Sequence, residues 1–423
     1  MNSTAAISSQ TELHALIRDR FGHEPDWSLS RRLRAATNWF ALDWPRLERT
    51  PLQKRRLDAI AVYDQPPADG ETQFINTGGL EMHLHNNVPV VRSIPEPWIQ
   101  RGVIFQSLRD ALDNSLVRQY LGSLLAEDSD KIAALNAALW QNGVFLYVPP
   151  GISETVEVVI QNYATSEVQA LLSRNVVVVG AQSRVAITER WFNAGAAHKM
   201  LLAANTEIIV EHGAEVQYGA IQQCEKNAEA FIHRAASVAG DARLDWHIGE
   251  FGAGLIVSSH QSHLNQAGAS TKSITVFFGS GQQHQDYTGK SVHHAPHTTS
   301  DMTARGVMKG KARSIFTGVT QIDKGARGSD GRQREQTLML TDDARADAIP
   351  SLVIDEQDVY AAHAASAGPV DRTAIFYLTS RGLTEEEATR LIVHGFLAPV
   401  IDAISQSALR DEVWQAVERK IRE

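Results

Sequence analysis

The stretch GDARLDWHI, residues 240–248, shows most directly how this chain folds. It opens with a glycine turn and continues with strict alternation of apolar and polar residues. Leu244, Trp246 and Ile248 are expected on one face of a strand, with the polar residues between them on the other face. Such a strand buries one face only, so the rest of its core must come from other segments of the chain.

The same pattern, a turn followed by alternation, recurs along the chain. It returns in GAQSRVAI from Gly180, GAEVQY from Gly213, GASTKSITV from Gly268 and GKARSIF from Gly310. In chain order the first four of these five turns are 33, 27 and 28 residues apart. A degenerate repeat of this length predicts the stacked coils of a solenoid, because each coil buries its apolar face only against its neighbours. A β-sandwich or jelly roll has similar short strands, and the pattern alone leaves that alternative open.

Helical patterns flank the repeat region. Thr384 and Glu387 form a capping box that opens a helix, and Pro399 is expected to kink or end it. The expected apolar residues are Ala388, Leu391, Ile392 and Gly395 in this helix, and Leu409, Val413, Trp414, Val417 and Ile421 in the last one. We therefore divide the chain into an N-terminal α/β or helical region over 1–141, a repeat core over 142–366 and a C-terminal helical segment over 367–423.

The composition is that of an ordinary globular protein. Of the 423 residues, 43% are apolar and 21% are charged, and the net charge is -9. This acidic balance argues against nucleic acid or an anionic membrane surface as the main partner. No apolar run approaches the ~20 residues that span a bilayer, and the N-terminus does not read as a signal peptide. These features predict a cytoplasmic protein.

Cys224 is the only cysteine. A single thiol excludes an intramolecular disulfide and a self-sufficient set of thiolate ligands for a cluster, and it fits a reducing compartment. A lone cysteine of this kind is more often a small buried residue than a reactive thiol, so we favour a structural role for Cys224.

The sequence TGKS, residues 288–291, resembles the end of a phosphate-binding loop. That loop requires a glycine five residues before its second glycine, and His284 stands there instead. Pro296 also blocks the helix that should follow. Nucleotide binding is therefore not expected here, and any ATP chemistry must come from another polypeptide.

Seven of the sixteen histidines lie between His247 and His297. His260 and His263 are predicted on opposite faces of a strand, as are His293 and His294. A metal site would need ligands from neighbouring coils, so we favour hydrogen-bonded histidines on the strands and in the turns. Catalytic motifs are scarce elsewhere, and Asp342-Asp343 is better explained as a turn than as a carboxylate pair.

Three stretches together resemble the SufB/SufD family of iron-sulfur cluster assembly proteins. They are ALNAALWQNGVFLYVPPG (134–151), the block from HHAPHTTSD to IPSLVI (293–354) and DVYAAHAASAGPVDRTAIFYLTSRGLTEEEATRLIVHGF (358–396). Their order and spacing make the match specific over roughly residues 130 to 405, whereas the N-terminal part matches only loosely.

This resemblance implies a mainly β protein with a right-handed parallel β-helix between the two flanking regions. It further implies a non-catalytic scaffold that pairs with a SufB-type chain, or with itself, through the β-helix. A SufC-type ATPase would dock on the C-terminal helices, for which the candidate residues are Leu391, Ile392, Phe396 and Trp414. No stably bound cofactor is expected, although a transient iron-sulfur cluster or iron shared with the partner chain fits the family.

Within the family the sequence is most like SufD. SufB-like chains carry His-Glu-Ala-Thr-Thr near the end of the β-helix, whereas this chain reads His363-Ala364-Ala365-Ser366. The SufB cysteine upstream is replaced near Gln336, and the cysteine that SufD-like chains often have two residues before the histidine is Ala361. The resemblance makes His363 the candidate ligand or proton-handling group at the interface with a SufB-type partner, and the candidate metal ligand of this chain, with a second ligand supplied by the partner. The alternative is a structural histidine bonded to the backbone.

Two rival functions remain open from sequence. A β-helix carbohydrate-active enzyme would need clustered carboxylates or a calcium site along the solenoid. A purely architectural homodimer would have no ligand role at all.

Overall fold

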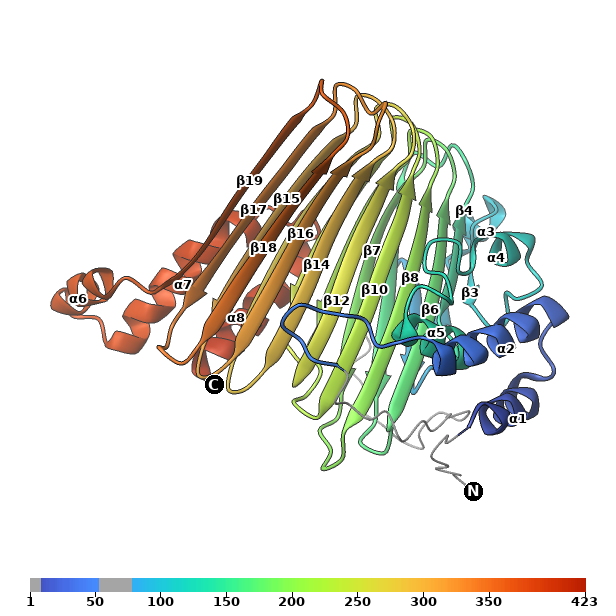
Figure 1. Cartoon of the computed structure of the whole chain (residues 1–423), viewed down its shortest axis with the longest axis horizontal. Coiled ribbons are helices and arrows are strands. Elements are labelled where there is room, and N and C mark those ends of the chain that lie inside the picture. The colour runs from blue at the N-terminus through green and yellow to red at the C-terminus, as the bar shows by residue number, and fades with distance from the viewer. Residues whose placement is uncertain (1–8, 53–77) are drawn as a thin grey trace.

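The computed structural model of the chain describes residues 9–52 and 78–423. Two sheets face each other and form a β-solenoid, which confirms the predicted parallel β-helix core and excludes the sandwich alternative (Figure 1). From β5 onward, odd-numbered strands build sheet A and even-numbered strands build sheet B, so each coil adds one strand to each sheet. All these strands pair in parallel with the strand of the next coil.

Sheet A contains, in chain order, β1 (Leu80–His85), β2 (Val88–Ser93), β5 (Thr155–Ala164), β7 (Arg184–Asn193), β9 (Glu215–Gln222), β11 (Arg243–Glu250), β13 (Ser270–Gly279), β15 (Thr299–Met308), β17 (Asp330–Met339) and β19 (Tyr360–Pro369). Sheet B contains β3 (Ile104–Ser107), β4 (Val144–Val148), β6 (Ala170–Val179), β8 (Met200–Val210), β10 (Ala228–Val238), β12 (Leu255–Leu264), β14 (His284–His293), β16 (Arg313–Ile322) and β18 (Arg345–Ile354).

The turns into sheet A share one backbone feature. From β7 to β17 the residue two positions before each strand has a positive φ: Gln182, Gly213, Asp241, Gly268, His297 and Gly328. Only half of them are glycine, since Asp and His tolerate this conformation better than most residues. Gly180 and Gly240, which marked two turns in the sequence, therefore do not occupy the left-handed position. The turn at Gly310 leads into β16 of sheet B, so the five stretches are not all equivalent.

The predicted alternation in β11 is confirmed. Leu244, Trp246 and Ile248 point into the lumen, the side-chain-filled space between the two sheets, and are 0%, 0% and 3% exposed. Further along the outer face of sheet A the strands end in apolar residues such as Val276 and Phe278, which C-terminal helices cover. The beginnings of the same strands carry charged and hydroxyl side chains on this outer face.

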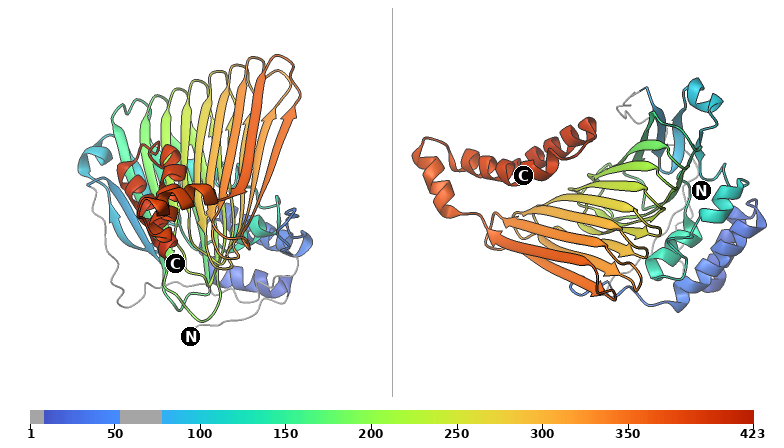
Figure 2. Two further views of the ribbon diagram at one scale, coloured as in Figure 1. Left: turned by 90° about the vertical axis from the view of Figure 1, so that its left-hand side faces the viewer. Right: turned by 90° about the horizontal axis from the view of Figure 1, so that it is seen from above.

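The N-terminal region closes one end of the solenoid. β2 pairs antiparallel with β1, and β3 pairs antiparallel with β4. The helices of this region are α1 (Gln10–Phe21), α2 (Asp26–Ala41), α3 (Glu96–Gln100), α4 (Ser115–Tyr120) and α5 (Lys131–Leu139). Of these, α5 packs directly on the outer face of sheet B, α2 packs on α5, and α1 packs on α2 (Figures 1 and 2). Leu135 of α5 and Leu172 of β6 share one apolar cluster.

The C-terminal segment contains α6 (Arg372–Ser380), α7 (Glu385–Ile401) and α8 (Ser407–Arg422). The capping box at Thr384 is confirmed by reciprocal hydrogen bonds with Glu387. Pro399 does not end α7 at its own position, since the helix continues for two more residues to Ile401. A proline this close to the helix end removes little of the hydrogen-bond ladder, and the buried Val400 and Ile401 hold the last turn against sheet A.

The predicted apolar face of α7 was partly wrong. Ala388 is buried as expected, but the remaining buried residues are Val393, Leu397, Val400 and Ile401, whereas Leu391 is exposed. In α8 the stripe of Leu409, Val413, Val417 and Ile421 is buried as predicted, and Trp414 lies at its partly exposed margin. The strands reach beyond the interval 142–366 at both sides, since β1 joins β5 and β19 ends at Pro369.

Candidate functional site

The two ends of the solenoid differ. At the N-terminal end each sheet finishes with a strand paired antiparallel, β2 or β3, whereas at the other end β18 and β19 continue the parallel stacking to the last member of each sheet. In the described residues, no strand pairs with the outer edge of either one. An edge strand presents unpaired backbone N–H and C=O groups and can template pairing with another chain.

The direction of these backbone groups follows from the hydrogen bonds that flank β19. The N–H groups of Tyr360 and Val370 donate to Ser329 and Met339 on the side of β17. Because backbone groups alternate in direction along a strand, the odd-numbered residues of β19 direct theirs to the open side. The strand reads YAAHAASAGP, so no charged side chain and no proline before Pro369 interrupts this edge.

The edge of β18 is different. The N–H groups of Arg345 and Asp355 donate toward β16, which places the even-numbered residues of β18 on the open side. Pro350 is one of them and has no N–H to offer there. Of the two edges, β19 is therefore the uninterrupted one.

His363 lies on β19 opposite Gln333 of β17, and its side chain faces the same small cavity as the lumen residues Met302 and Phe316. It is exposed, because no further coil covers it. Throughout 9–52 and 78–423 it makes no hydrogen bond, so the alternative of a backbone-bonded structural histidine is wrong. Both ring nitrogens of His363 are therefore without a hydrogen-bond partner in the described chain.

Sequence reasoning missed Glu335, which lines the same cavity. It is 8% exposed and, within the described ranges, forms no hydrogen bond or ion pair. Burial raises the pKa of its carboxyl to about 8. Gln336, near which the SufB cysteine was expected to be replaced, points to the outer face, so the inward-facing neighbour at that place is Glu335. The one available signal in the sequence was the alternation of residues along β17, which places Glu335 on the inward face of the strand.

Deeper in the lumen lies a cluster of buried charges. The Arg234 guanidinium is 3.5 Å from a Glu250 carboxylate oxygen and 4.0 Å from one of Glu189. The Tyr218 hydroxyl donates to Glu189 at 2.5 Å, and burial next to this carboxylate raises the pKa of the phenol. Burial lowers the pKa of the nearby His260 to about 3, so it stays neutral. The cluster sets one guanidinium beside two buried carboxyls, and burial raises the pKa of the Glu250 carboxyl. We assign the cluster a structural role.

Most histidines of the 247–297 region are hydrogen-bonded, as predicted. His293 points into the lumen and bonds the Thr298 and Ser300 hydroxyls at 2.8 and 2.9 Å. On the outer face His263 Nδ1 lies 3.1 Å from His294 Nε2, and His294 Nδ1 lies 2.6 Å from Asp323. Neighbouring coils do bring histidines together, yet the part of the chain placed in the structure holds no group of three or more His, Cys, Asp or Glu arranged for a metal.

The remaining sequence candidates fall into structural positions. Cys224 is 5% exposed, and burial raises the pKa of its thiol well above the ordinary value, so it is not a reactive thiolate. TGKS lies within β14, with no helix after it, and Asp342 and Asp343 form a turn between β17 and β18.

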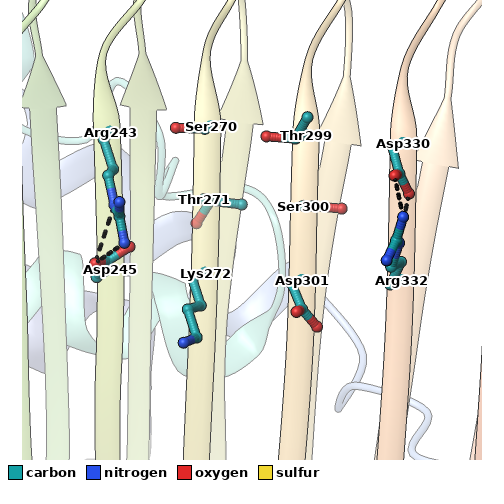
Figure 3. A pocket seen from close by; sticks show the side chains of 10 residues that line it. All are labelled: Arg243, Asp245, Ser270, Thr271, Lys272, Thr299, Ser300, Asp301, Asp330 and Arg332. Atoms are coloured by element: carbon teal, nitrogen blue, oxygen red, sulfur yellow. Dashed lines mark hydrogen bonds and ion pairs between the residues drawn. The ribbon is translucent and has the colours of Figure 1, made fainter. Parts of the chain in front are cut away.

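A groove of about 330 Å³ crosses the outer face of sheet A (Figure 3). Arg243 and Asp245 pair on one strand, and Arg332 and Asp330 pair on another, at 2.8 and 2.7 Å. A glycosidase needs two carboxylates as its acid and base. Of the three carboxylates that line this groove, Asp245 and Asp330 are neutralised by these arginines, and only Asp301 has no arginine paired with it. The groove does not support the carbohydrate-active alternative.

The C-terminal docking candidates are not equally accessible. Leu391 is 53% exposed. Ile392 is half-buried, Phe396 packs under the guanidinium of Arg305, and Trp414 stacks on His394 with ring centroids 4.6 Å apart. Sequence reasoning missed α6, where Phe376 and Tyr377 are 73% and 56% exposed and no residue is buried. The apolar run AIFYL, residues 374–378, was the available signal.

None of the helices in the described ranges combines the length and apolar character required to cross a membrane. Two family models match the chain. One is described as the SUF system FeS cluster assembly, SufBD core domain, over residues 161–396, and the other as the SufBD protein N-terminal region, over residues 81–161.

Relatives in other organisms match over nearly the whole chain. The iron-sulfur cluster assembly protein SufD of Bacillus subtilis is 30% identical over 415 residues, covering 94% of this chain and 95% of the relative. SufB of the same organism is 26% identical, covering 90% and 86%. A SufBD family protein of Staphylococcus epidermidis is 27% identical, covering 89% and 85%.

Proposed function

Because this chain belongs to the SufBD family of the SUF iron-sulfur cluster assembly system, we propose that it is a SufD-like scaffold subunit without catalytic activity of its own. It pairs with a SufB-type chain through the open end of the solenoid, and a SufC-type ATPase binds its C-terminal helices. A nascent cluster, or the iron for it, is then held transiently between the paired chains as cargo.

The observation that carries this proposal is the asymmetry of the solenoid. At one end the edge of sheet A is the antiparallel strand β2, which contains Pro89 and Arg92, while β19 ends the other with an uncharged, uninterrupted edge. An exposed edge of this kind is normally blocked by charges, proline or a covering element, because it otherwise pairs with other chains. Addition of a partner strand satisfies the free backbone groups, and the side chains of β19 then lie at the seam.

A second copy of this chain is the alternative partner. A two-fold axis at the edge would pair β19 antiparallel with β19 of the second copy. The small side chains of Ala361, Ala365 and Ala367 would allow the two strands to approach each other. Whether the partner is a paralogue or a copy is decided by the experiment below.

The ATPase site is proposed on α6 and the exposed side of α7. Phe376, Tyr377 and Leu391 are the large apolar side chains exposed there, and aromatic residues of this kind dominate protein interfaces. The absence of a phosphate-binding loop from the sequence is consistent with ATP hydrolysis by another subunit.

His363 is the proposed iron ligand at the seam. It is exposed and unbonded in the described chain, and a neutral imidazole binds iron. The only thiol, Cys224, is buried away from the seam, so thiolate ligands must come from the partner or from the cluster's sulfide. A reducing, cytoplasmic compartment would keep such thiolate ligands reduced and able to bind iron.

Co-expression with SufB-type and SufC-type chains tests the proposal. We expect a stable complex by size-exclusion chromatography with light scattering. Ala367→Pro removes an N–H on the open side of β19 without removing a bond to β17, and it should abolish pairing. Ala367→Ser keeps that N–H and should pair normally. Failure of wild-type protein to bind either partner or itself would refute the scaffold function, and pairing by Ala367→Pro would move the seam elsewhere.

A further inference from the structure

We propose that the outer face of sheet A carries a binding site for a small phosphate monoester, in the groove that β13, β15 and β17 form with the end of α7. This site goes beyond the proposed scaffold function and does not depend on it. The groove has a volume of about 240 Å³ and adjoins the groove of Figure 3, with which it shares Lys272 and Asp301. Its apolar walls are Ile274 of β13 and Pro399 and Val400 of α7.

The first argument is a set of unpaired cations. Five basic side chains line the two adjoining grooves. Arg332 is paired with Asp330 on its own strand, and Arg243 is paired in the same way (Figure 3). The remaining three form no ion pair in the described ranges, and all of them line the groove beside α7: Lys272, Arg305 and Arg334. Cations gathered without counter-charges at one groove attract an anion.

The second argument is the arrangement of these cations. Strand register sets Arg334 of β17 opposite Thr303, two residues before Arg305 on β15. Their Cα atoms are therefore about 8 Å apart by standard sheet spacings. Lys272 lies in register with Asp301 on the other side of β15, which puts its Cα about 12 Å from that of Arg334. Long side chains bridge such spacings, so the three charges can surround one ligand.

The third argument is that Arg305 is already held in place. Its Nη1 donates to the Phe396 carbonyl of α7, and its guanidinium lies over the Phe396 ring, 5.2 Å from the centroid. The donors on Nε and Nη2 have no acceptor in the described chain. Burial lowers the pKa of Arg305, and no carboxylate of the described chain offsets that effect. A fixed guanidinium with free N–H donors is suited to phosphate oxygens.

The fourth argument concerns the kind of anion. Three cations match the three acceptor oxygens of one phosphate monoester. Asp301 is the one carboxylate among the described residues that line the groove, and its Oδ1 is buried without a donor. A ligand hydroxyl would donate to this oxygen, so a phosphorylated polyol fits better than a bare anion. The C-terminal carbonyls of α7 carry partial negative charge, which places the phosphate near Arg334 and the carbon skeleton near Val400.

Calorimetric titration of the purified full chain tests this site, in about 0.15 M salt to screen non-specific attraction. The probes are glycerol 3-phosphate, methyl phosphate and succinate. We expect one glycerol 3-phosphate per chain, with the dissociation constant raised at least about tenfold by Arg334→Gln and by Lys272→Met. Neither side chain has a hydrogen bond or ion pair in the described residues, so both variants should melt like wild type. Arg332→Gln, on the same face of β17 but already paired, is the matched control and should bind as wild type.

The other probes test the chemistry of the ligand. Succinate, whose two charges sit on separate carboxylates, should bind more weakly than glycerol 3-phosphate, and equal binding would overturn the phosphate assignment. Asp301→Asn should reduce the preference for glycerol 3-phosphate over methyl phosphate, which has no hydroxyl for this carboxylate, and an unchanged preference would overturn the hydroxyl contact. Absence of saturable binding, wild-type affinity in Arg334→Gln, or an equal loss in Arg332→Gln would each refute the site and leave the scaffold function standing.

Discussion

Glu335 and His363 face one cavity from adjacent strands, and neither has a hydrogen-bond partner in the described chain. This relationship exists because the last coil of the solenoid has nothing stacked on it. A further coil would bury His363 and supply neighbours for both side chains.

Glu335 should make stability depend on pH in the metal-free protein. In the folded chain the carboxyl has a pKa of about 8, above the ordinary value of 4.5. The folded state therefore holds its proton more tightly than the unfolded state. The resulting contribution to the free energy of unfolding is fully present below about pH 4.5 and is lost as pH rises through 8. Glu335→Gln should remove this dependence and be more stable than wild type at pH 9, by on the order of 1–3 kcal/mol. Urea unfolding of both proteins at pH 5 and pH 9 measures this difference in stability. If the stability of the two proteins changed in parallel between these pH values, Glu335 would not be the group responsible.

His363→Ala should separate folding from cluster formation. The exposed imidazole makes no bond in the described chain, so its removal should shift the melting temperature by less than about 1 °C. Complex formation should also persist. Cluster yield, read from visible absorption after anaerobic reconstitution of the complex, should fall severalfold, and wild-type yield would remove His363 from the mechanism.

The buried cluster around Arg234 should be strongly stabilising as a unit. Arg234→Met leaves Glu189 and Glu250 unpaired in the lumen, and we expect a loss of about 3–5 kcal/mol in the free energy of unfolding. Arg184→Met is the control, because its partner Glu215 and its own side chain are both more than half exposed, and such pairs contribute little. Equal effects of the two changes, measured by denaturant unfolding, would show that the lumen tolerates unpaired carboxylates.

Changes on α6 should impair ATPase binding alone. Phe376→Ser with Tyr377→Ser alters two side chains that protrude into solvent, so thermal stability should be kept while affinity for a SufC-type subunit falls at least tenfold. Val413→Ser, in the buried stripe of α8, should instead lower the melting temperature. Calorimetric titration with the SufC-type subunit measures the affinity of each variant. Unchanged affinity in the α6 double variant would exclude that helix from the interface.

The sequence was most informative where local periodicity governs structure. Alternation placed Leu244, Trp246 and Ile248 in the lumen, and the capping box placed the start of α7, because both depend on neighbours within a few residues. Glycine was a weaker guide to the turns, since Gln182 and Asp241 occupy left-handed positions that glycine would occupy more readily.

By itself, then, the sequence determined that the chain forms repeating strands flanked by helices, and its motifs determined the family. The tertiary structure decided which coils stack against each other, and hence that His263 meets His294 on the outer face while Glu335 meets His363 at the open end. It also decided which face of α7 is buried. The physical reason is that residues of successive coils come together through strand pairing and packing over distances that no local pattern encodes.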